Sequence, residues 1–330
     1  MKFHMNLLSY LYQKLNLKYT YDEVIYEELI KEYNKKKSHG KPANRIIFMC
    51  DGKLFHGGLT DRLRGILSTF YIAKKLKKKF YINWHSPFPL EKYLIPNSYD
   101  WRINQDLIQY DKRIAVPLVF SEFPPQEYKV RNIFSYLLFI KWLSKRGKDK
   151  HIYTNFYLPK KKFPLLYNEL FKPTPYLLSQ INYHLKNLGR YYWSFSFRFQ
   201  NLLGDFKDII DRPPLNNIEA EKLINRNINE LKSIIRNLPK GYKCFVTSDS
   251  QIFLNRIKEI DNRIYIIPGN IFHIDLKKGT EKDWSKLFID QNLIMRAEKV
   301  YLLKTGEMYK SGFAEFAALI GGREYIYHYF

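Results

Sequence analysis

The sequence predicts an α/β protein with two Rossmann-like domains, and three observations lead to this expectation. A continuous apolar run of strand length at 45–50 is followed by a loop, an amphipathic helical stretch and a second apolar run at 80–84. From about residue 190, strand-like and helical stretches alternate through short connections. The 330 residues are enough for two domains, and the 45% of hydrophobic residues can supply a sizeable core.

The N-terminal part divides into a polar extension and a first domain. Residues 1–40 read as helical and end in a Lys-rich linker, so we expect a helical extension at 1–40 and a Rossmann-like domain at 41–188. In that domain, the runs at 45–50 and 80–84 enclose a helix whose apolar residues recur at helical spacing, which is typical of a β-loop-α-β unit. The less regular remainder predicts the following elements: a strand at 114–120 and helices near 131–145 and 174–187.

The C-terminal part, 189–330, is predicted to be a second Rossmann-like domain. Its expected strands are 190–199, 243–248, 263–268, 299–305 and 324–329. Its expected helices are 219–238, 250–260, 282–297 and 311–322. Ligands of such sheets bind beyond the carboxyl ends of the strands. Site candidates should therefore lie in the loops after five residues: Cys50, Phe199, Ser248, Pro268 and Thr305.

The chain is strongly basic, with a net charge of +23 from 55 Lys and Arg against 32 Asp and Glu. Such an excess attracts polyanions. However, the basic runs at 35–37, 74–79 and 160–162 are scattered, and the Lys, Asn, Ile and Tyr richness resembles the bias of an AT-rich genome. We therefore interpret the excess of Lys and Arg first as a generic solvated surface. The second interpretation is attraction to an anionic membrane or to a lipid-linked substrate. Nucleic acid is an unlikely partner, because no RNA- or DNA-binding motif is present.

Cysteine usage and the apolar runs predict a cytoplasmic protein, which could contact the inner membrane peripherally. Two cysteines in strand-like runs do not form a disulfide framework. The N-terminal stretch has no sustained apolar region or small-residue cleavage site. The run at 133–143 is too short to span a bilayer.

Several common chemistries lack their motifs. The sequence contains no GxxxxGK[ST] phosphate loop, no GxGxxG dinucleotide motif and no GxSxG nucleophile elbow. No Cys/His spacing typical of a metal site is present, and His273 with Asp275 at HxD spacing more often forms loop hydrogen bonds than a metal site. We expect neither a metal nor a bound cofactor.

Four segments, in order, resemble motifs of the GT-B-type fucosyltransferase superfamily, which includes α1,6- and nodulation-type, α1,2- and protein O-fucosyltransferases. GGLTDRL at 57–63 resembles a G-[LC]-G-[DN]-R-[LI] segment that precedes a helix, and SFRFQNLLGDF at 196–206 resembles a strand ending in HxR. TSDS at 247–250 resembles a T-D-[DS] strand end, and KSGFAEFAALIGG at 310–322 resembles S-x-F-S before an Ala-rich helix. The match covers about residues 43–325.

The resemblance implies a GT-B-like fold, in which two Rossmann-like domains face each other across a cleft, and a metal-independent glycosyltransferase. The donor would be a nucleotide sugar, GDP-fucose first, and the acceptor a glycan such as a bacterial surface polysaccharide or lipid-linked oligosaccharide. Arg198 would bind the β-phosphate, since guanidinium is a permanently charged bidentate donor. As GDP leaves and gains charge, this interaction would strengthen in the transition state.

The resemblance also implies roles for the other motif residues. Ser311, Gly312 and Phe313 open a helix and would bind phosphate through their N–H groups. Asp249 would accept hydrogen bonds from guanine or ribose, and His273 would line the nucleotide pocket.

On the side of the first domain, Gly57 and Gly58 would keep the backbone thin, and Arg62 would point toward the donor phosphate or the acceptor. An inverting transfer needs a base to deprotonate the acceptor hydroxyl. Asp205 is the first candidate for this base, with Asp61 and Glu315 in reserve.

The chain departs from the motifs at four positions, and this keeps a second function open. Ser196 stands where the family often has His, Thr60 replaces a glycine, Ser248 is inserted, and Ala314 replaces a serine. The alternative is a binding protein of polysaccharide assembly that keeps the GT-B fold but has lost its donor site.

Overall fold

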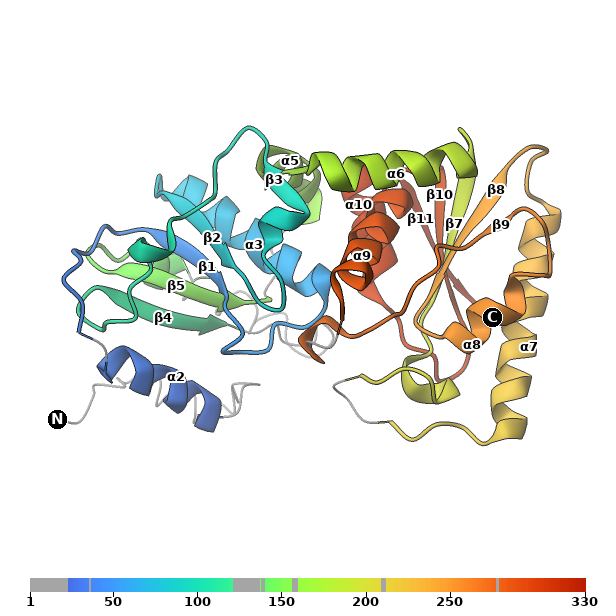
Figure 1. Cartoon of the computed structure of the whole chain (residues 1–330), viewed down its shortest axis with the longest axis horizontal. Coiled ribbons are helices and arrows are strands. Elements are labelled where there is room, and N and C mark those ends of the chain that lie inside the picture. The colour runs from blue at the N-terminus through green and yellow to red at the C-terminus, as the bar shows by residue number, and fades with distance from the viewer. Residues whose placement is uncertain are drawn as a thin grey trace.

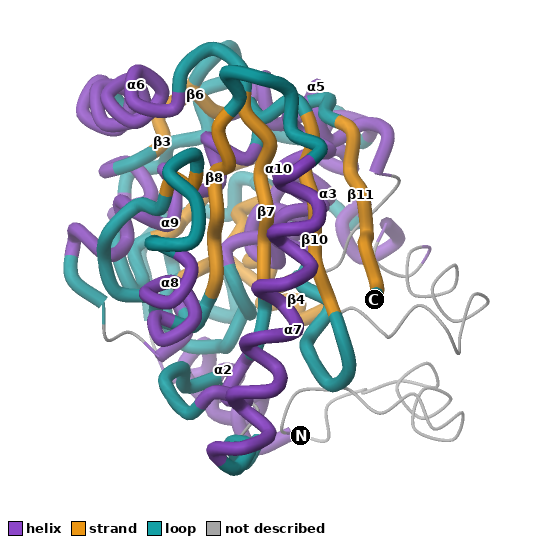
Figure 2. Tube along the Cα trace, turned by 90° about the vertical axis from the view of Figure 1, so that its right-hand side faces the viewer, coloured by secondary structure: helices purple, strands orange, loops and turns teal. Residues whose placement is uncertain are grey.

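The computed structural model describes residues 23–35, 37–120, 137, 140–155, 160–208, 212–276 and 279–330, and the structural statements below concern these residues. Two parallel sheets lie side by side, each covered by helices (Figure 1). Viewed at a right angle to this, the strands of the second sheet run parallel behind α7 (Figure 2). No described helix is both long and apolar enough to cross a membrane.

The first sheet has the strand order β2-β1-β5-β4, and all its pairs are parallel. Its strands are β1 (Ile46–Cys50), β2 (Phe80–Trp84), β4 (Ala115–Phe120) and β5 (Asp149–Thr154). The surrounding elements are α2 (Glu23–Lys35), α3 (Leu59–Lys75), the antiparallel pair β3 (Leu94–Pro96) and β6 (Phe171–Pro173), and α5 (Phe163–Leu170). Helix α6 (Pro175–Leu188) follows, leads from β6 to the second sheet and lies along that sheet beside helix α9, residues Glu281–Ile294 (Figure 1). We call β1–β5 with α2, α3 and α5 the first lobe.

The second sheet has the order β11-β10-β7-β8-β9 and is also parallel throughout. Its strands are β7 (Tyr192–Phe197), β8 (Lys243–Ser248), β9 (Ile264–Tyr265), β10 (Lys299–Lys304) and β11 (Glu324–Tyr329). Its helices are α7 (Asn217–Arg236), α8 (Gln251–Ile257), α9 (Glu281–Ile294) and α10 (Gly312–Gly321). Figure 1 shows α9 and α10 on the face toward the first lobe and α7 and α8 on the other. We call this unit the second lobe.

Local sequence explains the main elements. The run IIFMC is buried at every position, as a central parallel strand with both faces covered requires. Helix α7 begins after Asn216, whose side chain accepts a hydrogen bond from the Glu219 N–H, and it buries residues spaced three and four apart. Helix α10 is capped by Ser311 and ends at Gly322, which has φ 63°.

One apolar core runs from the first lobe into the second. It contains residues of β1, α3 and α5 together with residues of α9 and α10. Between the lobes, the rings of Tyr93 and Phe288 stack with centroids 4.7 Å apart, and Phe88 contacts both Trp284 and Phe288. The other face of the second sheet packs on α7 and α8 through a separate cluster. An aromatic interface therefore joins the lobes.

Most predicted elements are present. Strand β5, which lies between β1 and β4, was not predicted, and neither were β3, β6 and α5. The strand expected at 263–268 is limited to Ile264–Tyr265. Of the helical stretches expected at 1–40 and 131–145, residues 1–22, 36, 131–136, 138 and 139 lie outside the described residues. The boundary expected at 188/189 falls between α6 and β7, and the division into domains stays a prediction.

Candidate functional site

Arg198 directly follows β7 and is held by two carboxylates. Its Nη2 lies 2.8 Å from Oδ2 of Asp208, and its Nη1 lies 3.2 Å from Oδ2 of Asp249. The guanidinium also lies over the ring of Phe206, 4.4 Å from its centroid. The Arg198 side chain keeps 20% of its surface exposed, whereas Asp249 keeps only 2%. The two carboxylates and the ring therefore fix the position of the guanidinium, and part of the Arg198 side chain stays accessible to a ligand.

Asp249 lies beneath Arg198 with both oxygens occupied. Oδ1 accepts a hydrogen bond from the Phe199 N–H at 2.8 Å, and Oδ2 accepts one from the Gln200 N–H at 2.7 Å. Burial raises the pKa of Asp249 to about 6, although Arg198 opposes this shift. These contacts give Asp249 a role in holding the loop after β7. Its predicted contact with guanine or ribose stays a prediction.

Asp205 is used to fix helix α8. Its Oδ2 accepts hydrogen bonds from the Ser250 hydroxyl at 3.0 Å and from the Ile252 N–H at 2.8 Å. The side chain thus binds the first turn of α8, as an acidic group at a helix N-terminus does. The structure gives Asp205 a structural task that the sequence did not indicate.

His273 faces Arg198 through Asp208. Its Nε2 lies 3.7 Å from Oδ1 of Asp208, and its Nδ1 accepts a hydrogen bond from the Asp275 N–H at 3.3 Å. Burial lowers the pKa of His273, while the nearby carboxylates of Asp208 and Asp275 oppose this shift. The sequence prediction did not include Asp208. Its position depends on how the loop after β7 folds back, and no motif marks it.

The loop after β1 contacts the second lobe through Asp275. The Gly57 N–H donates to Oδ2 of Asp275 at 2.7 Å, and the Arg62 guanidinium forms an ion pair with Oδ1. Both charged side chains are 3% exposed. Arg62 also donates to the Gly57 and Ser86 carbonyls and contacts the Cys50 sulfur. Arg62 is thus buried between the lobes, and its predicted contact with donor or acceptor stays a prediction.

The two glycines of this loop have different reasons to be glycine. Gly57 has φ +81°, and a Cβ there would lie 2.5 Å from Oδ2 of Asp61. Gly58 has φ −69°, and the Asp61 side chain accepts a hydrogen bond from its N–H at 3.1 Å. Partial burial raises the pKa of Asp61, although Arg64 at 3.6 Å opposes the shift. Only Gly57 requires glycine for its backbone conformation.

The N-terminus of α10 meets an arginine of the first lobe. The Ser311 hydroxyl accepts a hydrogen bond from the Phe313 N–H at 3.2 Å. A Cβ on Gly312 would lie 2.8 Å from Nη2 of Arg64, so the guanidinium approaches the backbone closely here and would have to shift for any larger residue. Glu315, on the first turn, pairs with Lys160 at 2.6 Å. A cation at the positive end of a helix is repelled by the helix dipole, and an anion bound there would relieve the repulsion.

These contacts bring together most of the predicted site residues. Arg62 meets Asp275, the Asp275 N–H meets His273, His273 meets Asp208, and Asp208 meets Arg198. Gly312, at the start of α10, meets the first lobe through Arg64 instead. Ser196, at the position where His was expected, is buried and hydrogen-bonds to Thr247 at 2.9 Å.

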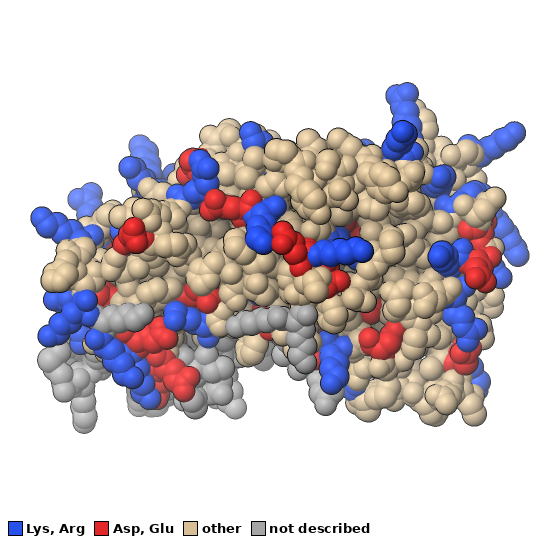
Figure 3. Space-filling view, in the orientation of Figure 1, with Lys and Arg blue, Asp and Glu red and all other residues tan. Residues whose placement is uncertain are grey.

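The charges around the site do not form one basic stripe on the face shown in Figure 3. Lys and Arg are spread over its edges and alternate with Asp and Glu.

Within the described residues, no group of three or more His, Cys, Asp and Glu side chains could hold a metal ion. Cys50 and Cys244 are buried and unbonded to each other, and burial raises the pKa of each thiol to about 12.

Comparison with known proteins finds similarity in structure alone. No protein-family profile matches the sequence, and no curated protein sequence does. The Bradyrhizobium fucosyltransferase NodZ superposes with a TM-score of 0.55 at 13% identity, over 85% of this chain and 94% of NodZ. NodZ α1,6-fucosyltransferase soaked with GDP-fucose gives the same TM-score over 84% of this chain and 92% of NodZ. A variant of Arabidopsis thaliana FUT1 bound to GDP gives 0.55 at 12% identity, over 96% of this chain and 77% of FUT1.

The chain has the GT-B-like fold of these fucosyltransferases. The α/β, GT-B-like fold class predicted from alternating strands, helices and four ordered motifs is thus confirmed, and the cleft between two domains stays a prediction. The likeness extends over most of each protein, so it includes both sheets.

Proposed function

We propose that the protein is a metal-independent, inverting glycosyltransferase that transfers fucose from GDP-fucose to a glycan. The observation that carries the proposal is the arrangement around Arg198, a guanidinium that is held by two carboxylates, keeps 20% of its side-chain surface exposed and lies at the carboxyl end of a central strand of a GT-B-like fold. Parallel sheets bind ligands at this edge, and guanidinium suits a diphosphate. The fold likeness to NodZ soaked with GDP-fucose and to FUT1 bound to GDP favours a guanine nucleotide donor.

A second cationic group supports a diphosphate at the junction of the lobes. Arg64 lies against Gly312 at the N-terminus of α10, where the helix dipole disfavours a cation unless an anion is bound. We propose that Ser311, Gly312 and Phe313 bind phosphate oxygens together with Arg64. The charge that develops on the leaving GDP would then be stabilised from both lobes.

We propose Asp61, one of the two reserve candidates of the sequence analysis, as the base. Asp205 and Asp61 each have Oδ2 engaged at a helix N-terminus, Asp205 by α8 and Asp61 by the Gly58 N–H, so the pKa decides between them. The pKa of Asp61 is raised by burial, and a base works best when its pKa lies near the pH of the reaction. Asp61→Asn should retain nucleotide binding and lose transfer, whereas Asp205→Asn should mainly lower the thermal stability. The opposite pattern would return the assignment to Asp205.

The acceptor and the cellular site complete the proposal. We propose a bacterial surface polysaccharide or lipid-linked oligosaccharide as the acceptor and the cytoplasmic face of the membrane as the place of work. The net charge of +23 supports attraction to an anionic surface. Sedimentation with anionic and with neutral vesicles measures this attraction, and equal binding to both would contradict it.

Thermal-shift titration with GDP, UDP and CDP tests the donor proposal. At a GDP concentration of about 100 times Kd, binding adds about 2.7 kcal/mol to the unfolding free energy, so the melting temperature should rise for GDP alone. Arg198→Ala should abolish the rise. Arg263→Ala removes an arginine that pairs with Asp261 away from the site, and it should preserve the rise.

Each outcome of this titration has a definite meaning. If no nucleotide raises the melting temperature of the wild-type protein, the donor proposal is wrong. If GDP binds but radiolabelled GDP-fucose yields no transfer to any glycan and no hydrolysis, the protein is the catalytically inactive binding protein that the missing His at Ser196 suggests.

A further inference from the structure

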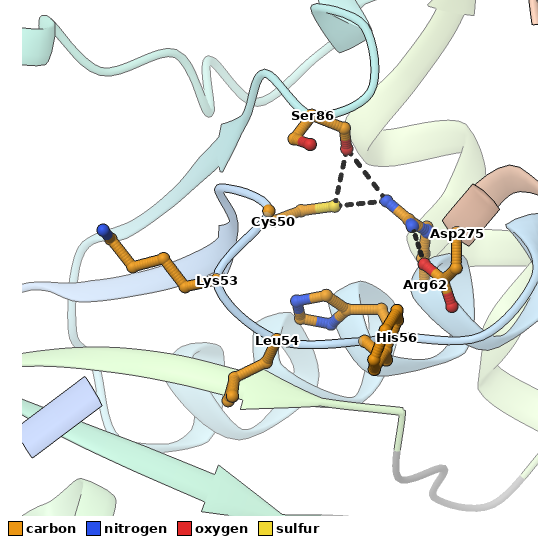
Figure 4. Close-up of a pocket in the computed structure, with 9 residues that line it drawn as sticks. Cys50, Lys53, Leu54, His56, Arg62, Ser86 and Asp275 are labelled. Carbon is orange, nitrogen blue, oxygen red and sulfur yellow. Dashed lines mark hydrogen bonds and ion pairs between the residues drawn. The ribbon is translucent and has the colours of Figure 1, made fainter. Parts of the chain in front are cut away.

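A small cavity lies at the carboxyl end of β1, next to the buried contact between the lobes. Its volume is about 80 Å³, which is room for a few water molecules or for the edge of one sugar ring. Its lining residues are Cys50, Gly52, Lys53, Leu54, Phe55, His56, Arg62, Ser86 and Asp275. Figure 4 shows the Cys50 and His56 side chains converging on this space, with Arg62 and Asp275 at its side.

His56 is the lining residue whose hydrogen-bonding capacity is least used. It is 1% exposed, its polar contact is a weak hydrogen bond to the Thr154 backbone, and neither ring nitrogen makes a hydrogen bond of normal length and angle. The rings of Phe48 and Tyr153 pack against it at centroid distances of 5.7 and 6.0 Å and fix its plane. A buried polar group without a partner is disfavoured by about 1–3 kcal/mol, so a ligand that satisfies it gains affinity.

The charges of the cavity are already balanced. Arg62 is paired with Asp275, and Lys53 is paired with Glu32 at 2.6 Å. The Ser86 carbonyl accepts hydrogen bonds from Arg62 and from the Cys50 thiol. A phosphate or carboxylate would find no uncompensated cation here, and desolvating it would be unfavourable. The cavity therefore suits a neutral group.

The state of the His56 ring identifies the neutral group. Burial lowers the pKa of His56 to about 3, although the Thr154 backbone opposes this shift, so the ring is neutral at physiological pH. With its N–H directed to the Thr154 carbonyl, the ring offers its other nitrogen as an acceptor, to which a hydroxyl group can donate. Phe55 lines the same cavity and is 50% exposed, and an exposed aromatic ring beside polar groups packs well on the C–H face of a sugar.

We infer that this cavity binds a neutral sugar of the acceptor, with His56 holding one of its hydroxyl groups and Phe55 packing on its ring. The inference deepens the proposed function and rests on it, because a glycan is expected at this site only if the protein is a glycosyltransferase. His56 acts in binding and not as the base, because so weakly basic a ring would not take a proton from a hydroxyl. The class of acceptor residue is thus a neutral hexose or N-acetylhexosamine and not a uronic acid.

Ring NMR of His56 gives a test that does not depend on transfer. In protein with ¹⁵N-labelled histidine, the His56 signals are assigned by their loss in His56→Phe. Methyl β-galactoside, methyl β-glucoside and methyl N-acetyl-β-glucosaminide are titrated separately, with methyl β-glucuronide and inorganic phosphate as charged probes. At least one neutral glycoside should shift the His56 nitrogens, and neither charged probe should.

Variants measure the strength of the contact. His56→Phe and Phe55→Ala should each weaken the responding glycoside about tenfold, whereas His56→Gln, which keeps a donor and an acceptor, should lose less. His184→Phe is the matched control, because His184 is a buried histidine bonded to Tyr265 on the other lobe. GDP-induced thermal shifts should be unchanged in all four variants.

The outcomes separate this inference from the proposed function. If GDP binds but no neutral glycoside shifts His56, or if His56→Phe binds the glycoside as well as wild type, the cavity holds water only and the inference is wrong. If phosphate or the glucuronide shifts His56 instead, the cavity is an anion site and the inference is equally wrong. Loss of GDP binding in the wild type contradicts the proposed function, whatever the glycosides do.

Discussion

His56 and His151 make folding of the protein sensitive to acid. Burial lowers the pKa of each ring to about 3 in the folded state, against an ordinary value of 6.5. Because the folded state favours the neutral ring, the stability from each histidine is complete above pH 6.5 and is lost as the pH falls toward 3. At pH 5 each ring lowers the unfolding free energy by about 2 kcal/mol relative to pH 8.

Replacing one ring should remove its share of this acid sensitivity. In His56→Phe, the loss of unfolding free energy between pH 8 and pH 5 should be smaller than in wild type by about 2 kcal/mol, because one proton uptake on unfolding is removed. Urea unfolding at a series of pH values measures the difference. His39→Phe, at an exposed position, is the control and should keep the wild-type slope. Equal slopes in all three proteins would mean that His56 is accessible to water.

For single residues, the sequence predicted which side chains lie at the site better than it predicted the residues with which they pair. Arg198 was predicted at the site because it follows a strand and matches a motif, and it lies at the carboxyl end of β7. Asp208 and Arg64 were missed, since an ion-pair partner on a loop depends on how distant segments pack. His56 directly precedes the GGLTDRL motif, yet the sequence does not indicate that its ring is buried with no hydrogen bond of normal geometry.

Strand β5 shows why one element was missed while its neighbours were predicted. Its sequence DKHIYT is polar, and periodicity alone does not indicate a central strand. In the fold all six residues are buried because distant side chains satisfy them. Asp149 pairs with Arg45 at 2.6 Å, and His151 hydrogen-bonds to Tyr33 at 2.6 Å. Tertiary contacts thus replaced the apolar pattern that predicted β1, β2 and β4.

The packing of α3 on β5 depends on a single glycine. A Cβ on Gly65 would lie 2.1 Å from the Thr154 carbonyl oxygen and 2.9 Å from the Phe48 ring. Gly65→Ala should lower the unfolding free energy by about 1–3 kcal/mol through overpacking, despite the better helix propensity of alanine. Gly58→Ala is the control, since its Cβ meets only Asp61 at 3.9 Å. If denaturant unfolding finds Gly65→Ala no less stable than Gly58→Ala, α3 packs farther from β5 than described.

For the whole molecule, the interface between the lobes was beyond prediction from the sequence. The stack of Tyr93 on Phe288 and the pair of Arg62 with Asp275 join residues about 200 positions apart. Local periodicity predicts α3 and α9, which carry Arg62 and Phe288, but does not indicate which of their faces meet the other lobe. The fold class was predictable because the alternation of strands and helices and the order of motifs are local properties of the sequence. The interface between the lobes depends on contacts between distant residues and was therefore not predictable.

Among the ion pairs that cross this interface, two differ strongly in burial and allow a matched test of what holds the lobes together. Arg62 and Asp275 are 3% exposed, whereas Lys92 and Glu281 are 47% and 65% exposed. Asp275→Asn leaves a buried guanidinium without its counter-charge and should lower the unfolding free energy by about 3–5 kcal/mol. Glu281→Gln removes a solvated pair and should lower it by less than about 1 kcal/mol.

Urea unfolding followed by tryptophan fluorescence and by circular dichroism compares the two variants and shows whether the lobes still unfold together. The double variant Arg62→Met with Asp275→Leu should recover much of the stability lost in Asp275→Asn, because replacing both charges removes the unpaired one. Equal urea unfolding midpoints for Asp275→Asn and Glu281→Gln would show that the buried ion pair does not hold the lobes together. The stack of Tyr93 on Phe288 and its aromatic neighbours would then stabilise the interface.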